Sequence, residues 1–572
     1  MSEPVIAGYQ RQFVEALASA LGMPVADIDA MVKPAEPQHG DFSFPTFALA
    51  KAQKKAPPAI ANALAAQLSV PGLRVAAAGP YVNARVDSSA LTLAVIGATR
   101  KEGEAYGGST SGLGQTVVID YSSPNIAKPI AFHHIRSTMI GHALTNLYRA
   151  HGWKVEGINY LGDWGKQFGL VAVGFQAFGD PAKRHDVGHL VEVYVKANER
   201  AAADPEFDAL ARGFFRKMEE GDVAALALWR EFREASLVEF RAIYQRLGIV
   251  FEHYEGESDY QNKMDAVVAA IQATIGTKES EGALIVDMPY ENDEPPVLLK
   301  KSDGSTLYAT RDLAAAIDRH NRFSFNRALY VVATDQSLHF RQFFEVLRRM
   351  GKPWASQLVH VNFGRVHGMS TRKGQIRLLA DVLDEARNRA SEKVAENIAA
   401  GRIQTSDAAK LAEQIGVGAI VFGDLKNRRA TDYTFDWEEV LSLEGHTGAY
   451  LQYAHARACK LLEKGDFRVG PFDSTLLSLP EEEAVVRSVA RFPVVTQDAL
   501  EANEPSLLAR HLLDLAACFS RWYTLGNQDR TKRVLSDDEP ATKTARLALV
   551  DSVRVALENG LQLLGIAAPT QM

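Results

Sequence analysis

QTVVIDYSSPNIAKPIAFHHIRSTMIG, residues 115–141, is the stretch that decides the fold. Its first seven residues are mostly apolar and β-branched, which predicts a buried strand. A polar loop with Lys128 follows, and apolar periodicity over residues 130–148 predicts a helix. The expected first turn of this helix holds His133 and His134. Free N–H groups and the positive end of the helix dipole attract anions there, so the stretch predicts a nucleotide-phosphate site.

The length, hydropathy, net charge and cysteine content of the chain limit the class of protein. At 572 residues the chain is too long for one hydrophobic core, so about three or four domains are expected. No apolar run approaches the roughly 18 residues of a membrane span. A net charge of −7 argues against non-specific DNA binding. Cys459 and Cys518 lie in apolar helical contexts, which favours core packing over a disulfide or a metal pair. We therefore expect a cytoplasmic, monomeric protein that contacts neither membrane nor DNA.

The rest of the chain indicates a multidomain α/β protein. Residues 1–106 read as a small α+β domain, and residues 107–384 as a doubly wound, Rossmann-like parallel sheet with ligands at the carboxyl ends of its strands. A helical insertion within this sheet is expected at about 172–290. A helical stem at 385–435 and an all-α bundle at 436–572 follow. Strands are predicted at 154–160, 329–333 and 358–363, and helices at 381–400, 408–428, 447–464, 481–499, 507–525 and 541–564.

A second candidate phosphate site is the basic loop FGRVHGMSTRKG, residues 363–374. Its glycines flank Ser370, Arg372 and Lys373, and such a loop can hold a triphosphate and neutralise departing pyrophosphate. Taken alone, the loop also fits a solvated basic turn. The two candidate phosphate sites are far apart in the chain, yet a doubly wound sheet brings such loops to one edge.

Two further sets of side chains indicate the kinds of ligand that the protein could bind. Tyr308 and Asp312 are four residues apart at a predicted helix start, so they share one face, and a carboxylate is the partner that a guanidinium needs. Taken singly, they also fit a core aromatic residue and a first-turn carboxylate. Tyr450, Tyr453 and Arg457 form a stripe on a helix of the bundle. Such a stripe is commonly a core edge, but it also suits stacking on unpaired RNA bases.

The first stretch resembles the signature of the class I aminoacyl-tRNA synthetases and, within them, that of the arginyl-tRNA synthetase family. The family pattern runs Ser-Pro-Asn-Ile-Ala-Lys-Pro, then His-X-Gly-His, then Leu/Ile-Arg-Ser-Thr, and residues 123–129 and 134–138 match it without a gap. Ala131 stands where the family has the first histidine, and His133 where it has glycine. We expect His133 to supply the missing donor. Residues 363–374 resemble the second class I signature, Lys-Met-Ser-Lys-Ser, in the degenerate form that arginyl enzymes use.

The resemblance implies a role for each candidate residue. The implied catalytic residues are Lys128, His133, His134, Met369, Ser370, Arg372 and Lys373. The implied arginine pocket, in which Asp312 faces the guanidinium, consists of Asp120, Ser122, Asn125, Tyr308, Asp312 and Gln336. The implied ATP contacts are Lys128, His134, Gly162, Asp163, His339, His367 and Met369. The implied tRNA contacts are Tyr81 and Asn83 in the first domain and Tyr450, Tyr453, Arg457 and Met572 in the anticodon-binding bundle.

The resemblance covers nearly the whole chain and implies an arginine–tRNA ligase. L-Arginine would attack ATP to give arginyl-adenylate and pyrophosphate, and the terminal ribose of tRNA(Arg) would then take the arginine, releasing AMP. Mg²⁺ would be held by ATP and water, so no metal site made by protein side chains is expected. Two alternatives stay open. One is a class I ligase for another amino acid, and the other is a catalytically silent tRNA-binding relative with an altered His-X-Gly-His element.

Overall fold

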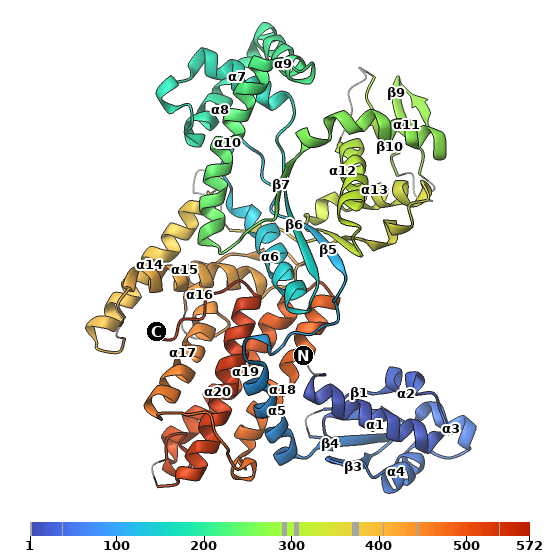
Figure 1. The fold of residues 1–572 in the computed structure, drawn as a ribbon, viewed down its shortest axis with the longest axis vertical. Coiled ribbons are helices and arrows are strands. Elements are labelled where there is room, and N and C mark those ends of the chain that lie inside the picture. The colour runs from blue at the N-terminus through green and yellow to red at the C-terminus, as the bar shows by residue number, and fades with distance from the viewer. Residues whose placement is uncertain are drawn as a thin grey trace.

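A five-stranded parallel sheet forms the centre of the molecule in the computed structural model (Figure 1). The model describes residues 3–36, 38–288, 294–302, 308–368, 377–403, 405–442, 445–536 and 538–572. The strand order is β12-β11-β5-β6-β7. The strands are β5 (Thr116–Asp120), β6 (Lys154–Leu161), β7 (His253–Gly256), β11 (Arg327–Tyr330) and β12 (Leu358–His360). The chain order reverses between β5 and β11, so their carboxyl ends border the switch point of a doubly wound sheet, as predicted.

The apolar composition of β5 explains its position at the centre of the sheet. Val117 and Ile119 of β5 are fully buried and Val118 is 2% exposed, because helices cover both faces of the sheet. A strand covered on both faces needs apolar residues without alternation, which is what the sequence provides. The covering helices include α6 (Ile135–Ala150), α12 (Tyr308–Phe323) and α13 (Ser337–Arg349).

The insertion predicted at about 172–290 is only partly helical. Its helices are α7 (Lys166–Phe178), α8 (Val187–Ala203), α9 (Pro205–Glu219) and α10 (Val223–Arg246). The mostly helical insertion that the sequence predicted also contains β7, which completes the parallel sheet. As an edge strand reading His-Tyr-Glu-Gly, β7 lacks the apolar run that marks a buried strand. Helix α11 (Met264–Thr274) follows, and then an antiparallel sheet of β8 (Lys278–Ser280), β9 (Ala283–Val286) and β10 (Val297–Lys300).

The N-terminal part is a small α+β unit, drawn in blue in Figure 1. Its antiparallel sheet has the order β1-β2-β4-β3. The strands are β1 (Lys33–Pro34), β2 (Phe42–Pro45), β3 (Leu73–Ala78) and β4 (Tyr81–Val86), and the helices are α1 (Val5–Leu21), α2 (Val25–Met31), α3 (Phe47–Gln53) and α4 (Pro57–Gln67). Helix α5 (Ser88–Glu102) leads out of this unit and packs against the C-terminal bundle.

The last third of the chain is almost entirely helical, and its helices agree with the predicted ranges to within a few residues. The stem holds α14 (Leu379–Ala399), α15 (Ala408–Leu425) and α16 (Trp437–Val440), and the bundle holds α17 (Gly448–Lys464), α18 (Pro480–Glu501), α19 (Pro505–Gln528) and α20 (Pro540–Leu563). Three bundle helices begin at a proline, whose fixed φ and missing N–H suit the first helical position. Within the described part of the chain, no helix is long and apolar enough to cross a membrane.

Helix α6 connects the sheet to the C-terminal helices. It follows β5, packs against β5 and β6, and also contacts α15, α18, α19 and α20. Met139, Ala143 and Leu147 on this helix are fully buried. The helix that carries the first signature is therefore shared between the sheet, the stem and the bundle.

Candidate active site

The five parallel strands end on one edge of the sheet, and each continues into a polar segment. Parallel strands place such segments side by side. The segments are residues 121–128 after β5, 162–163 after β6, 257–258 after β7, 334–336 after β11 and 362–367 after β12. Most of the predicted catalytic, arginine and ATP residues within the described part of the chain lie in these segments.

The loop after β5 has a strained backbone. Ser122, Ser123 and Ala127 have φ values of 70°, 48° and 57°, in the left-handed region that side chains with a Cβ rarely adopt. Each such residue costs on the order of 1–3 kcal/mol and persists only where its surroundings hold it. One such contact comes from the insertion, because the Ala127 N–H donates to Ser236 Oγ on α10 at 2.8 Å. Strain of this kind is common at ligand sites.

Asn125 and Lys128 are the exposed side chains of this loop. Asn125 lies against the end of β6, where the Ile126 N–H donates to the Gly162 carbonyl at 3.2 Å. A Cβ at Gly162 would lie 1.9 Å from Asn125 Oδ1, so only glycine allows this approach. Lys128 Nζ lies 5.1 Å from the centre of the Tyr194 ring on α8. The predicted ATP residue Gly162 thus positions the predicted arginine residue Asn125.

Ser122 lies inside the fold and not in the predicted arginine pocket. Its side chain is buried, and its Oγ lies 2.8 Å from Thr138 Oγ1 and 2.7 Å from Tyr244 Oη. Its N–H donates to Ser137 Oγ at 2.9 Å. These bonds fasten the loop to α6 and α10.

Asp163, a predicted ATP residue, makes its contacts within the fold. It is fully buried, and Arg233 Nε donates to its Oδ2 at 3.0 Å. The Ser258 N–H and Oγ each donate to the carboxylate at 2.9 Å, and Trp229 Nε1 donates to the Asp163 carbonyl at 2.7 Å. Burial raises the pKa of Asp163 even though these donors oppose the rise. Asp163 therefore joins the end of β6 to α10 and to the segment after β7.

Asp120, at the end of β5, has a guanidinium partner within the chain. Arg319 Nη1 on α12 donates to Asp120 Oδ2 at 2.8 Å, and Ser123 Oγ donates to Oδ1 at 3.0 Å. Arg319 Nε also donates to Glu255 Oε2 at 3.3 Å, and the Arg319 side chain is 1% exposed. Burial raises the pKa of Asp120, and the charge of Arg319 opposes the rise. The structure thus places Asp120 on an internal arginine, whereas the sequence predicted contact with a substrate guanidinium.

The two histidines precede α6 in a single 3-10 turn, residues 132–134, instead of lying within the first α-helical turn. Their ring centroids are 4.2 Å apart, and His134 Nδ1 lies 3.1 Å from the Ala131 carbonyl oxygen. Burial lowers the pKa of His134 to about 4, the neighbouring His133 lowers it further, and the contact with Ala131 opposes this. Burial also lowers the pKa of His133. Both rings are therefore neutral at pH 7 and act as hydrogen-bonding groups, not as cations.

Four of the residues predicted to bind arginine or ATP gather around the start of α12. His339 Nε2 lies 2.6 Å from Asp312 Oδ2, which places this predicted ATP residue beside the predicted arginine carboxylate. Tyr308, one turn earlier on α12, is 66% exposed, and the Arg311 guanidinium lies 5.8 Å from its ring centre. Gln336 is exposed and stands at the residue before α13, without a capping hydrogen bond from its side chain. The four belong to α12, to α13 and to the turn that precedes α13, and the contact between His339 and Asp312 joins the two helices.

Glu257 is a site residue that the sequence analysis missed. It follows β7, and Arg311 Nη1 lies 3.5 Å from its Oε2. Burial raises its pKa to about 7; Arg311 opposes this, and the charges of Asp312 and Asp163 add to it. In the sequence, Glu257 stands in Glu-Gly-Glu-Ser. This segment indicates a site residue only once β7 is recognised as a strand that ends there. Arg319, in the interior of α12, was missed as well, because an arginine inside a helix usually faces solvent.

The second phosphate-site loop is only partly described, since Met369, Ser370, Arg372 and Lys373 lie outside the described residues. Its approach is β13 (Val366–His367), which pairs in parallel with β14 (Tyr433–Thr434). His367, a predicted ATP residue, is exposed, and its Nε2 lies 3.2 Å from Asp432 Oδ2. A Cβ at Gly364 would lie 2.6 Å from the Thr431 carbonyl carbon, so glycine is needed where this segment meets the stem.

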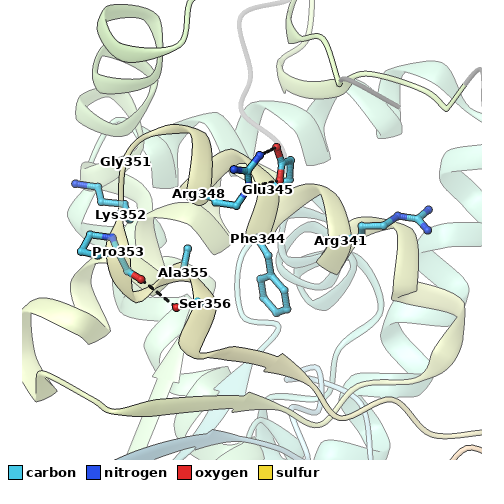
Figure 2. A pocket seen from close by; sticks show the side chains of 9 residues that line it. All are labelled: Arg341, Phe344, Glu345, Arg348, Gly351, Lys352, Pro353, Ala355 and Ser356. Carbon is cyan, nitrogen blue, oxygen red and sulfur yellow. Dashed lines mark hydrogen bonds and ion pairs between the residues drawn. The ribbon is translucent and has the colours of Figure 1, made fainter. Parts of the chain in front are cut away.

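A cavity of about 500 Å³ lies away from this edge of the sheet (Figure 2). It is lined by Arg341, Phe344, Glu345, Arg348, Gly351, Lys352, Pro353, Ala355 and Ser356, which belong to α13 and the turn before β12. A helix that follows a parallel strand runs back to the strand's amino end, so this cavity is on the opposite side from the candidate site. Within the described ranges, no cluster of three or more His, Cys, Asp or Glu side chains is arranged to hold a metal ion.

The predicted anticodon stripe is one connected surface. The Arg457 guanidinium on α17 lies 4.6 Å from the Tyr453 ring centre and 4.7 Å from that of Tyr523 on α19. Tyr450 Oη lies 3.2 Å from Ser520 Oγ, also on α19. Tyr453 is 37% exposed, so the stripe is an accessible edge where α17 meets α19.

The remaining predicted tRNA residues differ in accessibility. Tyr81 is 40% exposed and packs edge-on against the exposed Phe47, with ring centroids 5.7 Å apart. Asn83 is 4% exposed within the N-terminal sheet, so the structure separates it from the Tyr81 surface. Met572 is partly buried and packs against a cluster of α14, α15 and α17 that includes Ala449. Phe47 was missed because a phenylalanine at a helix start reads as a core residue.

Comparison with known proteins gives matches over most of the chain. The family model described as the catalytic domain of class I (R) tRNA synthetases matches residues 99–437. The DALR anticodon binding domain matches residues 451–572, and the arginyl tRNA synthetase N terminal domain matches residues 8–86.

Individual relatives cover the chain from end to end. It is 42% identical to arginine–tRNA ligase 1 of Bacillus cereus and to the arginine–tRNA ligase of an Exiguobacterium species, in each case over 99% of this chain and 100% of the relative. Its fold is similar to that of Thermus thermophilus arginyl-tRNA synthetase, with a TM-score of 0.83 at 24% identity over 99% of this chain and 100% of the other. The Plasmodium falciparum enzyme gives a TM-score of 0.83 at 22% identity, over 100% of this chain and 99% of the other. The chain belongs to the arginyl-tRNA synthetase family, whose members are class I ligases that join arginine to tRNA.

Proposed function

We propose that the edge formed by the five strand ends joins L-arginine to tRNA(Arg) in two steps. In the first, an arginine carboxylate oxygen attacks the α-phosphorus of ATP, and the bond to pyrophosphate breaks. In the second, a hydroxyl of the terminal ribose of tRNA attacks the arginyl carbonyl, and AMP leaves as the hydroxyl proton is lost. Mg²⁺ enters with ATP, held by phosphates and water. A monomeric, cytoplasmic protein remains our prediction.

The observation that carries the arginine assignment is a pair of neighbouring acidic side chains, Asp312 on α12 and Glu257 after β7. The charge of Asp312 raises the pKa of Glu257, and Arg311 Nη1 lies 3.5 Å from Glu257 Oε2. The charge of Asp120 is already offset by Arg319. When Glu257 is ionised, these two carboxylates and one guanidinium carry a net negative charge, which a substrate guanidinium would neutralise through bidentate hydrogen bonds. We propose that Tyr308, Gln336 and Asn125 complete the arginine site, as their match to the family pattern implies.

The ATP site is supported by the geometry around the start of α6. His134 is neutral and can accept or donate without adding charge, and Lys128 supplies a cation. The first turn of α6 adds free N–H groups to the phosphates. Positioning and charge neutralisation carry this step, and Met369, Ser370, Arg372 and Lys373 complete the site by their place in the second signature.

Two accessible surfaces suit contact with tRNA. Tyr450, Tyr453 and Arg457 offer aromatic and guanidinium planes for unpaired bases of the anticodon loop. The exposed pair Phe47 and Tyr81 offers a second such surface on the N-terminal domain.

Pyrophosphate exchange tests the proposal. The purified protein is given ATP, labelled pyrophosphate and single amino acids, with and without tRNA(Arg). We expect exchange with arginine alone among the amino acids. Asp312→Asn should raise the arginine KM by about two orders of magnitude, because it removes a charge from a largely desolvated pair. The matched control is Asp318→Asn, six residues further along α12, where the carboxylate pairs with Lys263.

The outcomes separate the alternatives. Exchange with a different amino acid would overturn the arginine assignment, and tight tRNA binding without any exchange would favour a silent relative. In the same assay, His133→Ala should raise the ATP KM if His133 replaces the donor missing at Ala131. An unchanged ATP KM would remove that role from His133.

A further inference from the structure

The insertion contacts the loop after β5 at two consecutive residues. The Ala127 N–H donates to Ser236 Oγ on α10 at 2.8 Å, and Ser236 is fully buried. At the next residue, Lys128 Nζ lies 5.1 Å from the centre of the Tyr194 ring on α8. Helices α8 and α10 pack against each other, so both contacts come from one packed unit. The insertion therefore holds the backbone just before Lys128 and also contacts the end of its side chain.

The Tyr194 ring is held in place by the core of the insertion. Tyr194 is half-buried, and it packs against a buried cluster on α7, α8 and α9 that consists of Leu170, Ala197, Phe207 and Ala211. Side chains in close-packed surroundings keep a single orientation. The ring is therefore a fixed surface, and a group that rests on it is held where the insertion places it.

An aromatic ring can hold a cation without neutralising it. The face of a tyrosine ring attracts an ammonium group that lies within about 6 Å of its centre. Lys128 is exposed, and it has no carboxylate partner among the residues that the structure describes. A carboxylate would cancel the charge of Lys128 and compete with a phosphate for it, whereas the ring leaves that charge available. The ring also restricts a long side chain that would otherwise lose its rotamer freedom only when it binds a ligand.

We propose that Tyr194 is a positioning residue that holds Lys128 ready for the phosphates of ATP, which rests on the role proposed above for Lys128. The ring contact raises the fraction of protein molecules in which the ammonium already lies beside the loop after β5. Apparent affinity falls in proportion to the fraction of molecules that are ready to bind, so a weaker ring contact raises the ATP dissociation constant.

Equilibrium binding of ATP to ring variants tests this role. The full-length protein is titrated with MgATP by calorimetry, without arginine or tRNA. Tyr194→Phe keeps the ring, and Tyr194→Leu keeps an apolar side chain without a ring. Replacement of Tyr194 by a trifluorinated phenylalanine keeps the shape of the ring, but fluorine withdraws electron density from its face and weakens its attraction for a cation.

The variants should separate according to the face of the ring. Tyr194→Phe should leave the ATP dissociation constant unchanged, because the hydroxyl does not hold the ammonium. Tyr194→Leu and the fluorinated ring should each raise it by roughly two- to fivefold, the range expected for a cation–ring contact at an exposed site. In a Lys128→Met background neither change should have a further effect, because the cation on which the ring acts is absent. A ring that only packs against the loop would keep its effect in that background.

The insertion offers a matched control. The Arg200 guanidinium on α8 lies 4.7 Å from the centre of the Phe207 ring on α9. A trifluorinated ring at Phe207 therefore weakens another cation–ring contact of the same insertion, one that does not involve Lys128. This variant should keep the wild-type ATP dissociation constant.

Several outcomes would overturn the role of the ring. They are an unchanged ATP dissociation constant with the fluorinated ring, an equal loss of affinity in Tyr194→Phe and Tyr194→Leu, a loss of the same size in the Lys128→Met background, and the same loss from the Phe207 control. If Tyr194→Leu does not fold, the fluorinated ring decides the question, because it preserves the packing. Failure of the proposed function would appear separately, as absent pyrophosphate exchange with arginine in a protein whose ATP affinity still depends on the ring.

Discussion

The Glu257 carboxyl has a pKa of about 7, because its burial raises the pKa from the ordinary value for a glutamate. Its carboxyl lies between Arg311 and the carboxylates of Asp312 and Asp163. Below that pH it is neutral and contributes no charge to the arginine pocket. A bound guanidinium favours the ionised form, so arginine binding and loss of this proton are linked.

The pH dependence of arginine use follows from this linkage. As pH rises through about 7, Glu257 ionises, and the arginine KM should fall by about tenfold and then level off. Pyrophosphate exchange at saturating ATP, measured from pH 6 to pH 8.5, gives the profile. In Glu257→Gln, the arginine KM should stay at its high value across this pH range. A Gln variant that retains the wild-type profile would assign the titration to another group.

At the scale of elements, α17 has one buried face and one exposed edge. Its buried face packs against α15 and α20, and its exposed edge carries Tyr453 and Arg457. The guanidinium of Arg457 lies between the rings of Tyr453 and Tyr523, which holds it in one plane for stacking. The edge is therefore ordered before RNA arrives, and less side-chain entropy is lost on binding.

Removing this edge should weaken RNA binding without affecting the chemistry. Tyr453→Ala and Arg457→Ala should each raise the tRNA KM for aminoacylation by roughly five- to a hundredfold, because stacking on one base is worth about 1–3 kcal/mol. The ATP and arginine KM values at saturating tRNA should not change. Arg468→Ala is the control, since the Arg468 side chain is 85% exposed on the same bundle and pairs with Asp466. Equal effects of the Arg457 and Arg468 variants would indicate a general charge effect.

The elements themselves were largely predictable from sequence, and the exceptions have physical causes. The bundle helices carry long 3.6-residue periods, and α18, α19 and α20 begin at a proline, so the local sequence pattern was sufficient to predict them. The edge strand β7 has four residues and no apolar run, and only pairing with β6 defines it. Ser122 and Asp163 were assigned to ligands, yet their partners Tyr244 and Arg233 are far away in the chain, and no local signal reports such contacts.

At the scale of the whole molecule, three buried histidines lie where α6 meets the C-terminal helices. His142 and His151 belong to this region of α6, and His511 belongs to α19. Burial lowers the pKa of each to about 4. A cation at any of these positions would have no water around it, so the junction is assembled from neutral rings.

The junction should therefore weaken in acid. The folded-state pKa of these histidines lies below the unfolded value near 6.5, so the unfolded chain takes up protons first as pH falls. The stability they contribute is complete above about pH 6.5 and is lost as pH falls toward 4, by roughly 1–1.5 kcal/mol per histidine at pH 5.5. Urea unfolding at pH 7.5 and pH 5.5 measures the loss. In His511→Gln, the loss of unfolding free energy between pH 7.5 and pH 5.5 should be smaller by about the contribution of one histidine. An unchanged loss would contradict a role for His511 in the acid sensitivity of the junction.

The enclosure of α6 also has a consequence for synthesis. The helix is complete at Ala150, but the helices that cover it reach Leu563, about 400 residues later. At about 5–20 residues per second, its apolar face waits tens of seconds on the ribosome for its final neighbours. The sheet and the insertion can form early, yet the segment that begins the active site cannot reach its final packing until almost the whole chain has emerged. A truncated chain that lacks the bundle therefore carries an unfinished catalytic centre, even though every residue proposed to bind ATP and arginine is present in it.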